Sequence, residues 1–282
     1  MSGFTSKISY AKQHDVYFDD GREIELLQRI FNLPSQKLNA LRNQPAAILA
    51  VIDGFATEKY LMNIGEMKGK LVTDLISHHR PKTMVELGGY VGYSTLLFAS
   101  HLRKTWVDSG VSYEPQYYCL EMNPLFGAII MALVDLAGLS DTVRVVIGPS
   151  SSSLKRLHSE GTIDNIGLLF LDHFKPAYIS DLKLCESLEF VVPGTVLAAD
   201  NVIKPGNPPY LRYVRMSAEK KTIEEKEALE SMVKEGIKLV NGRIEPRGNP
   251  GLIYESRMVE SYEPTGIQDA IEISVCVGRI EQ

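Results

Sequence analysis

The chain has 282 residues, of which 44% are apolar and 23% are charged, and this composition is typical of a folded globular protein. Its formal net charge of −5 excludes the basic surface that a phosphate backbone requires, so we expect no nucleic-acid partner. Three dispersed cysteines are too few for a disulfide framework or a zinc site and are typical of a reducing compartment. Residues 2–29 lack the apolar centre of a signal peptide, and no apolar run approaches the ~18–20 residues of a membrane span. We therefore expect a cytoplasmic protein without a membrane partner.

Helical and strand patterns alternate along the chain. Apolar residues at helical spacing predict an N-terminal helical segment over residues 20–80, which ends at Pro81. Strands are expected at residues 83–87, 117–120, 143–147, 166–171 and 195–199, with helices at 93–102 and 128–137 between them. The tail 270–279 alternates apolar and polar residues, which predicts an antiparallel strand at the edge of the sheet. The alternation predicts an α/β fold with helices on both faces of a mostly parallel sheet, in a single domain over residues 1–282.

Two polar stretches interrupt this pattern. Residues 103–116 are expected to form a loop before the second strand. Residues 218–251 are interpreted as an insertion that begins with a charged helix, in which Lys221–Glu225 and Glu230–Lys234 have the spacing of helical ion pairs. Both stretches are expected to be solvated.

A glycine-rich stretch, VELGGYVGYS (85–94), follows the first predicted strand. Glycines at a strand–helix junction let the backbone turn tightly and approach a ligand, and the next helix offers free N–H groups. Gly88 and Gly92 are four residues apart, which disfavours the G-x-G-x-x-G spacing of a dinucleotide site. The stretch favours a nucleotide-like ligand; the alternative is that these glycines serve only helix–strand packing.

Glu121 lies at the end of the second predicted strand. A carboxylate there can accept hydrogen bonds from both ribose hydroxyls of a ligand held at the sheet edge. Acids at strand ends are common, so Glu121 carries weight only together with the glycine stretch. The two features together predict an adenosine-containing cofactor.

Polar side chains also follow two later predicted strands: Asp172 comes after one, and Asp200 and Asn201 come after the next. Because the carboxyl ends of parallel strands meet at one edge of a sheet, we expect these side chains to converge. Oxygen ligands suit Mg²⁺, so the pattern predicts a magnesium site whose remaining positions are open to water and substrate. The alternative is that each acid only caps the helix that follows it.

Lys175 lies three residues after Asp172, close to the predicted cation. A nearby dication disfavours an ammonium group, so a lysine in this place can act as a general base; the alternative is a surface lysine. We interpret His173 as a packing or cofactor-flanking residue, because a hard cation prefers oxygen ligands.

Six motifs follow one another along the chain: MNIGEMKGK (62–70), VELGGYVGYS (85–94), EMNP (121–124), VDLAGLSDTV (134–143), FLDHFK (170–175) and ADNVIKPG (199–206). In this order and spacing they resemble the catechol O-methyltransferase family. The resemblance covers residues 20–209 and resumes near the C-terminus.

The resemblance implies a Rossmann-like class I methyltransferase fold, with a seven-stranded sheet that has one antiparallel strand, and it implies S-adenosylmethionine and Mg²⁺ as cofactors. By this resemblance the metal ligands are Asp172, Asp200 and Asn201. The implied contacts of S-adenosylmethionine are Met62, Ile64, Glu86, Tyr90, Ser94, Glu121, Met122, Ser150, Ser151, Asp172, His173 and Phe174.

The implied substrate is a small-molecule catechol. By the same resemblance it lies against Tyr60, Lys175, Asn201 and Pro205, and Lys175 removes the proton of the reacting hydroxyl. A C-terminal glutamate binds the second hydroxyl, and Glu260 is expected in that place rather than Glu255. Tyr60 and Phe174 stand where the family often has tryptophan, which changes the shape of the ring edge.

Two alternatives remain beside catechol methylation. A related metal-dependent O-methyltransferase would act on larger phenolic diols, and segments 56–61 and 205–262 would decide this. A non-catalytic S-adenosylmethionine-binding protein is the other alternative, and the presence of Asp172, Lys175, Asp200 and Asn201 together argues against it. The oligomeric state is left open.

Overall fold

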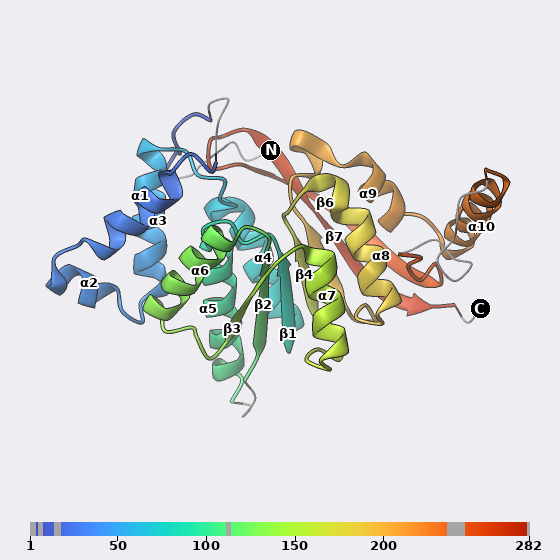
Figure 1. The fold of residues 1–282 in the computed structure, drawn as a ribbon, viewed down its shortest axis with the longest axis horizontal. Helices are drawn as coiled ribbons and strands as arrows, with labels where there is room; N and C mark the ends of the chain where they lie inside the picture. The colour runs from blue at the N-terminus through green and yellow to red at the C-terminus, as the bar shows by residue number, and fades with distance from the viewer. Residues whose placement is uncertain (1–3, 5–7, 14–17, 111–113, 236–245, 281–282) are drawn as a thin grey trace.

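The computed structural model describes residues 4, 8–13, 18–110, 114–235 and 246–280, and these form a seven-stranded sheet with helices on both faces (Figure 1). The strand order is β3-β2-β1-β4-β5-β7-β6. Strands β1 to β5 pair in parallel, and β7 is antiparallel to both β5 and β6. The expected seven-stranded sheet with one antiparallel strand is confirmed.

The five parallel strands are short and largely apolar because helices cover both of their faces. They are β1 (Thr83–Leu87), β2 (Gln116–Glu121), β3 (Val143–Ile147), β4 (Leu168–Leu171) and β5 (Val196–Ala199). Each overlaps a strand that the sequence predicts. Successive side chains enter opposite core layers: Met84 packs in one, and Val85 packs in the other.

The helices divide between these two layers. On one face lie α1 (Arg22–Phe31), α2 (Ser35–Leu41), α3 (Pro45–Glu58), α4 (Gly65–His79), α5 (Tyr93–Asp108) and α6 (Pro124–Leu136). On the other lie α7 (Ser150–Ser159), α8 (Tyr178–Ser187) and α9 (Pro208–Val214). In the described part of the chain, none of the helices is long and apolar enough to cross a membrane.

Helix α5 is longer than the sequence predicts. It continues to Asp108, whereas the sequence places its end at Leu102 and a loop over 103–116, so the loop prediction is wrong for residues 103–108. Trp106 explains the extension, because its Nε1 donates to the carbonyl of Pro81 at 2.9 Å and its ring packs against the core. Residues 111–113 of the expected loop lie outside the described residues.

The C-terminal strand does not lie at the sheet edge. β7 (Gln268–Arg279) is flanked by β5 and by β6 (Leu252–Tyr262), and β6 forms the edge. The alternating pattern is misleading here because the polar residues of β7 are buried with partners. Glu272 is fully buried and accepts from Nε and Nη2 of Arg215, at 2.7 Å each.

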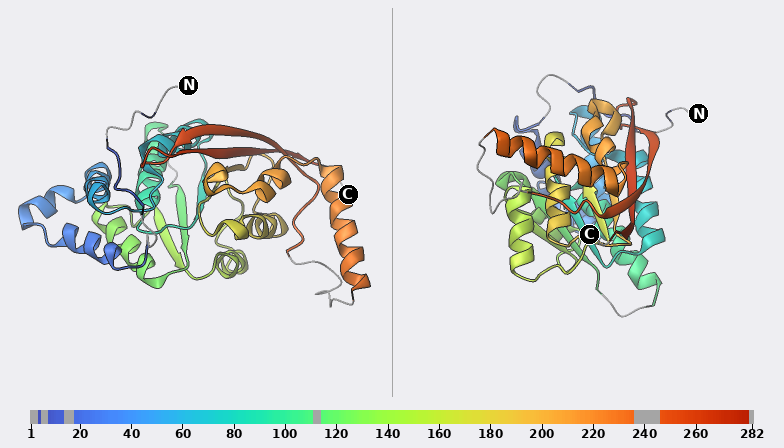
Figure 2. Two further views of the ribbon diagram at one scale, coloured as in Figure 1. Left: turned by 90° about the horizontal axis from the view of Figure 1, so that it is seen from above. Right: turned by 90° about the vertical axis from the view of Figure 1, so that its right-hand side faces the viewer.

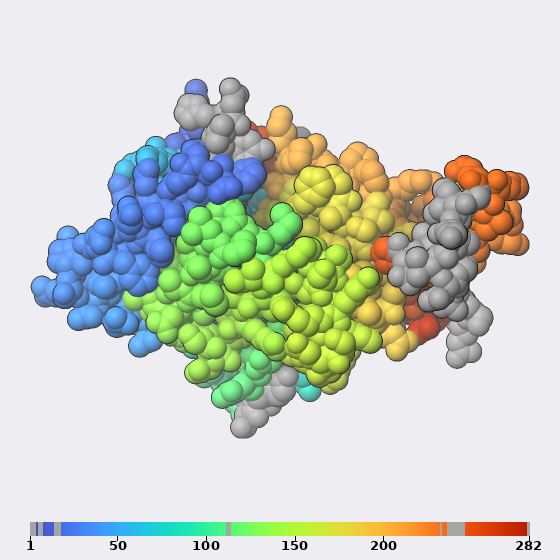
Figure 3. Space-filling view, viewed as in Figure 1, coloured from blue at the N-terminus to red at the C-terminus, as the bar shows by residue number. Residues whose placement is uncertain are grey.

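The expected insertion begins with α10 (Ala218–Lys234), which projects from the rest of the molecule (Figure 2, Figure 3). One lysine of this helix is not solvated as expected: Lys221 is only 4% exposed. Its Nζ lies 4.4 Å from the ring centre of Tyr254 and 4.8 Å from that of Tyr213, and it donates to the carbonyl of Leu252 at 3.1 Å. Residues 236–245 of the insertion lie outside the described residues.

Candidate active site

The carboxyl ends of β1, β4 and β5 lie side by side and place the predicted acids on neighbouring strands. The N–H of Asp172 donates to the carbonyl of Leu87 at 3.0 Å, and the N–H of Asp200 donates to the carbonyl of Leu171 at 2.9 Å. The hydroxyl of Tyr178 donates to the carbonyl of Leu171 at 2.7 Å and lies 3.3 Å from that of Asp200. These bonds hold the two acidic strand ends together.

Gly88 is needed where the end of β1 meets the end of β4. Its φ is 91°, and a Cβ atom at this position would lie 2.7 Å from the carbonyl oxygen of Asp172. Only glycine adopts this conformation without strain and leaves room for the neighbouring backbone. This glycine therefore serves close packing beside the site.

Glu121 binds the backbone of the glycine-rich stretch. Its Oε2 accepts from the N–H groups of Gly89 and Tyr90 at 3.0 and 2.9 Å, and its Oε1 accepts from the N–H of Asn123 at 2.8 Å. Tyr90 has a φ of 49°, which few L-residues adopt, and these bonds support it. Each carboxylate oxygen has two lone pairs, so Glu121 retains acceptor capacity for a ligand.

Glu86 lies beneath the same stretch and is fully buried. Ser94 and Thr95 each donate to it at 2.5 Å, and the hydroxyl of Tyr117 donates at 2.9 Å. Burial raises the pKa of Glu86 to about 7, although the three donors oppose this shift. Glu86 and Ser94 therefore bond to each other and tie the start of α5 to β1.

Lys68 is a buried cation at the acidic strand ends, and no motif or strand-end pattern in the sequence predicts a role for it. Its Nζ donates to Asp200 at 2.7 Å, to Glu263 at 2.6 Å and to Asp269 at 2.9 Å. Burial lowers the pKa of Lys68, but the three carboxylates outweigh this effect and raise it overall. Lys68 thus neutralises part of the negative charge that the strand ends collect.

Glu263, rather than Glu260, is the C-terminal glutamate that the structure brings to these acids. It follows β6, and burial together with repulsion from Asp200 raises its pKa despite the neighbouring Lys68. Glu260 is exposed on β6, where its Oε2 accepts from Gln268 at 3.2 Å. Strand β6 pairs Glu260 with β7 and ends at Tyr262, just before Glu263, so Glu263 and not Glu260 lies beside the acidic strand ends.

Asn201 presents an amide oxygen at the same place. It is half-buried with a φ of 59°, and its Nδ2 donates to Glu263 at 2.6 Å and to Asp269 at 3.0 Å. Because both N–H groups of the amide are engaged, its Oδ1 is the atom left to act as a ligand.

The side chains of Asp172, Asp200 and Asn201 offer oxygen atoms, which are the donors that a hard divalent cation prefers. Burial and repulsion from Asp200 raise the pKa of Asp172 despite the opposing effect of Lys175, and a bound dication would relieve that repulsion. The described residues contain no group of three or more His, Cys, Asp and Glu side chains placed to hold a metal. The candidate set therefore depends on the amide of Asn201 beside the two carboxylates.

Lys175 lies directly beside Asp172. Its Nζ donates to Asp172 Oδ1 at 2.9 Å and to the hydroxyl of Tyr178 at 2.8 Å, and its side chain is 19% exposed. The carbonyl of Lys175 accepts from Asn207 Nδ2 at 2.8 Å, which fixes the backbone of this turn. The amine of Lys175 is therefore hydrogen-bonded to Asp172, one of the expected metal ligands.

His173 is held by a small polar network on the other side of Asp172. Its Nε2 lies 2.8 Å from Asp181 Oδ2, and Ser150 donates to the same oxygen at 2.5 Å. The imidazole stacks on Tyr178 with 5.0 Å between ring centres. Its Nδ1 is buried and has no hydrogen-bond partner within the described residues. This nitrogen is therefore a buried polar atom whose hydrogen-bonding capacity is unused.

Two large apolar side chains among the expected cofactor contacts face solvent: Met122 is 70% exposed and Phe174 is 73% exposed. Ile64 is buried just before α4. The other expected contacts lie half-buried or exposed on the α3–α4 connection, in α7 and in the turn after β5: Tyr60, Met62, Ser151 and Pro205.

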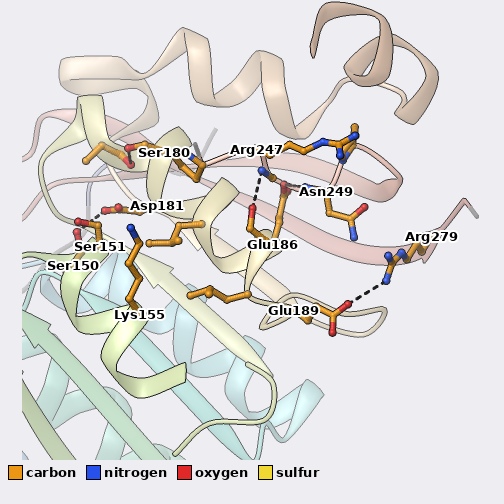
Figure 4. Close-up of a pocket in the computed structure, with 17 residues that line it drawn as sticks. Ser150, Ser151, Lys155, Ser180, Asp181, Glu186, Glu189, Arg247, Asn249 and Arg279 are labelled. Atoms are coloured by element: carbon orange, nitrogen blue, oxygen red, sulfur yellow. Dashed lines mark hydrogen bonds and ion pairs between the residues drawn. The ribbon is translucent and has the colours of Figure 1, made fainter. Parts of the chain in front are cut away.

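A cavity of about 900 Å³ adjoins this network between α7, α8 and the loop before β6 (Figure 4). Ser150 and Asp181 line it at one end, and Arg247 and Arg279 line it at the other (Figure 4). Its walls do not include the acidic strand ends. The cavity therefore lies beside the region expected to hold a cofactor, not over the expected metal site.

The class of protein follows from comparison with known sequences. The model of the O-methyltransferase family matches residues 47–240, and the chain belongs to this family. The predicted enzyme class, an O-methyltransferase, is confirmed.

Individual relatives narrow the class. Catechol O-methyltransferase of Bos taurus is 35% identical over 195 residues, which are 69% of this chain and 66% of the bovine protein. That of Mus musculus is 36% identical over 192 residues, 68% of each chain. The chain thus matches about two thirds of the length of these relatives, and the resemblance to catechol O-methyltransferases is confirmed.

Solved structures agree on the fold. An O-methyltransferase from Bacillus cereus, in complex with SAH, has a TM-score of 0.51 at 19% identity and covers 93% of each chain. The O-methyltransferase TomG from Streptomyces achromogenes, in complex with SAM, has a TM-score of 0.50 at 18% identity, over 94% of this chain and 93% of that one. The expected Rossmann-like methyltransferase fold is confirmed.

Proposed function

We propose that the protein transfers the methyl group of S-adenosylmethionine to one hydroxyl of a catechol. The observation that carries this proposal is the convergence of Asp172, Asp200, Asn201 and Glu263 at one sheet edge with the amine of Lys175 beside them. A chelating pair of oxygens on the substrate is what such an edge would recognise. The similarity to catechol O-methyltransferases supports the same substrate class.

S-adenosylmethionine would lie along the ends of β1, β2 and β4. Glu121 would accept hydrogen bonds from the ribose, and Met122 and Phe174 would be covered by the adenine. With Nε2–H donating to Asp181, the Nδ1 of His173 is an acceptor that fits the amino group of adenine. Two structurally similar O-methyltransferases, solved in complex with SAH and with SAM, support this cofactor.

The acidic strand ends would hold the catechol through a cation. Mg²⁺, bound by Asp172, Asp200 and Asn201, would supply Lewis acidity that lowers the pKa of the reacting hydroxyl. Glu263 would accept a hydrogen bond from the second hydroxyl, and Lys68 would hold the carboxylate of Glu263 in place.

Lys175 would act as the general base. Its amine lies at Asp172 and is fixed by Tyr178, so it is within reach of an oxygen held at that carboxylate. S-adenosylmethionine would supply the methyl group from its sulfonium, which would be left as a neutral thioether as the oxygen–carbon bond formed, and Lys175 would take the hydroxyl proton. Positioning of the two substrates supplies the remainder of the rate.

The test is methyl transfer from labelled S-adenosylmethionine to a panel of small catechols, larger phenolic diols and monohydric phenols, with Mg²⁺ and with EDTA. We expect methylation of the small catechols that EDTA abolishes, and none of the monohydric phenols. Methylation of only the larger diols would show that the substrates are larger phenolic diols and not small catechols. Binding of the cofactor without methylation of any diol would overturn the catalytic proposal.

A further inference from the structure

An N-terminal segment crosses the molecule close to Glu263. Residues 8–13, which we call the N-terminal strap, run between α3 and the turn 263–267 that joins β6 to β7. The N–H of Tyr10 donates to the carbonyl of Pro264 at 3.1 Å, and the N–H of Ala11 donates to the carbonyl of Ala56 at 2.8 Å. In Figure 1 the dark-blue N-terminal segment reaches the tip of the red β6–β7 hairpin.

Tyr10 anchors the strap through a buried ring and a hydrogen-bonded hydroxyl. It is only 6% exposed, and its hydroxyl donates to Asp53 Oδ1 at 2.6 Å. The same hydroxyl accepts from Asn63 Nδ2 at 3.4 Å, and Tyr93 donates to the other oxygen of Asp53 at 3.4 Å. The ring therefore fixes the strap to α3 and to the connection that leads into α4.

The turn that follows β6 is held on two sides. Within it, the N–H of Glu263 donates to the carbonyl of Ile267 at 2.8 Å. On one side Pro264 packs on Gly65 so closely that a Cβ atom there would lie 2.3 Å from the proline ring. On the other side Tyr10 holds the carbonyl of Pro264. Pro264 is thus clamped between the start of α4 and the strap.

A second contact reaches the same hairpin. The centre of the Phe4 ring lies 5.8 Å from that of Tyr262 in an edge-on arrangement. A Cβ atom at Gly266 would lie 3.5 Å from the Phe4 ring, so Phe4 also covers this glycine. Aromatic pairs prefer this edge-to-face geometry, and the contact adds to the attachment of the hairpin. Both ends of the turn therefore contact the N-terminal region.

We propose that the N-terminal strap positions Glu263, with Tyr10 as its positioning residue. Glu263 immediately precedes the clamped proline, and its side chain meets Lys68 and Asn201 at 2.6 Å each. The inference rests on the proposed function, in which Glu263 binds the hydroxyl that is not methylated. By fixing that carboxylate, the strap fixes where the second hydroxyl lies, and so limits how the ring of an unsymmetrical catechol can be turned in the site.

The experiment compares Tyr10→Ala and Tyr10→Phe with Tyr254→Phe in the full chain. Tyr254→Phe is the matched control, because Tyr254 is also buried and also donates to a carboxylate, that of Glu186, at 2.6 Å, and lies outside the site. The readouts are the ratio of the two methylated isomers of 3,4-dihydroxybenzoate, KM and kcat, the Kd of S-adenosylmethionine, and amide hydrogen exchange over residues 263–267.

For Tyr10→Ala we expect an isomer ratio at least threefold closer to one, a KM for the catechol raised about tenfold, and a Kd for the cofactor within twofold of wild type. Exchange over residues 263–267 should be at least tenfold faster. Tyr10→Phe should show the same changes to a smaller extent, and Tyr254→Phe should show none of them.

A lowered Tm with unchanged isomer ratio, KM and turn exchange would overturn the proposal, because the strap would then be only structural. If the wild type methylates no diol, the proposed function fails, and the exchange measurement still tests whether the strap holds the turn. If Tyr10→Ala does not fold, Tyr10→Phe and Phe4→Ala decide by the same readouts.

Discussion

Glu263 and Glu260 are three residues apart and meet different surroundings. Glu263 contacts Lys68 and Asn201, whereas Glu260 is exposed on an edge strand. Glu263→Gln should lower kcat/KM for a catechol about 10–100-fold, because a hydrogen bond to a charged group stabilises by about 1.5–3 kcal/mol. Glu260→Gln is the matched control and should stay within twofold. Equal effects of the two variants in steady-state kinetics would contradict the assignment of Glu263.

Lys175 offers a second prediction for a single side chain. Lys175→Met keeps the length of the side chain and removes the amine, so kcat should fall about 10²–10⁴-fold, as expected for loss of a general base. KM for the catechol should change far less, and the Kd of S-adenosylmethionine should stay near the wild-type value. The measurement is steady-state kinetics together with calorimetric titration of the cofactor, and an unchanged kcat would remove Lys175 from the role of base.

The sequence indicates Asp172, Asp200 and Asn201 because each follows an apolar strand, and parallel topology places strand ends together. Lys68 was not found, although it lies four residues after Ile64 and four before Val72 on a buried helix face. A lysine in that pattern is a signal of a buried ion pair. Glu263 was not found because its place depends on where β6 ends, which requires the pairing of two distant segments.

At the scale of elements, α10 is attached to the body through Lys221. Lys221→Ala should lower the free energy of unfolding by about 1–3 kcal/mol, because it removes cation–π contacts and a buried hydrogen bond. Cleavage by a protease within residues 218–251 should become faster while methyl transfer stays unchanged. Lys220→Ala, at an exposed neighbouring position, is the control. Equal cleavage rates for the two variants would contradict the anchoring role.

Local patterns predicted the parallel strands and the N-terminal helices well, because their periodicity reflects burial directly. They failed where a distant partner decides the outcome. Helix α5 extends because Trp106 bonds to Pro81, and β7 lies between β5 and β6 with its buried Glu272 neutralised by Arg215. Neither partner can be inferred from the segment itself.

For the whole molecule, the buried acids determine how stability depends on pH. Glu86 has a pKa raised from 4.5 to about 7 in the folded protein. Between these values the native state keeps a proton that the unfolded state has released, so the free energy of unfolding falls as pH rises through this window. The loss from Glu86 should approach about 3 kcal/mol at pH 8.

Urea unfolding of the wild type and of Glu86→Gln at pH 5 and pH 8 measures this effect. The variant cannot titrate at this position, so its stability should fall less between the two pH values. Glu255→Gln, at an exposed position on β6, should keep the wild-type dependence. The same pH dependence in all three proteins would exclude Glu86 as its source.

The contact between Phe4 and Tyr262 has a practical consequence for anyone who expresses this protein. A purification tag fused ahead of Met1 would be joined to the chain three residues before Phe4, whose ring contacts the residue that precedes Glu263. The other chain end leaves from Arg279, at the far end of the 12-residue strand β7, about 40 Å from the turn 263–267 at ~3.3 Å per residue. A tag at the C-terminus is therefore the safer choice for enzyme assays, and isomer ratios measured with uncleaved N-terminal fusions should be compared with those of the tag-free protein.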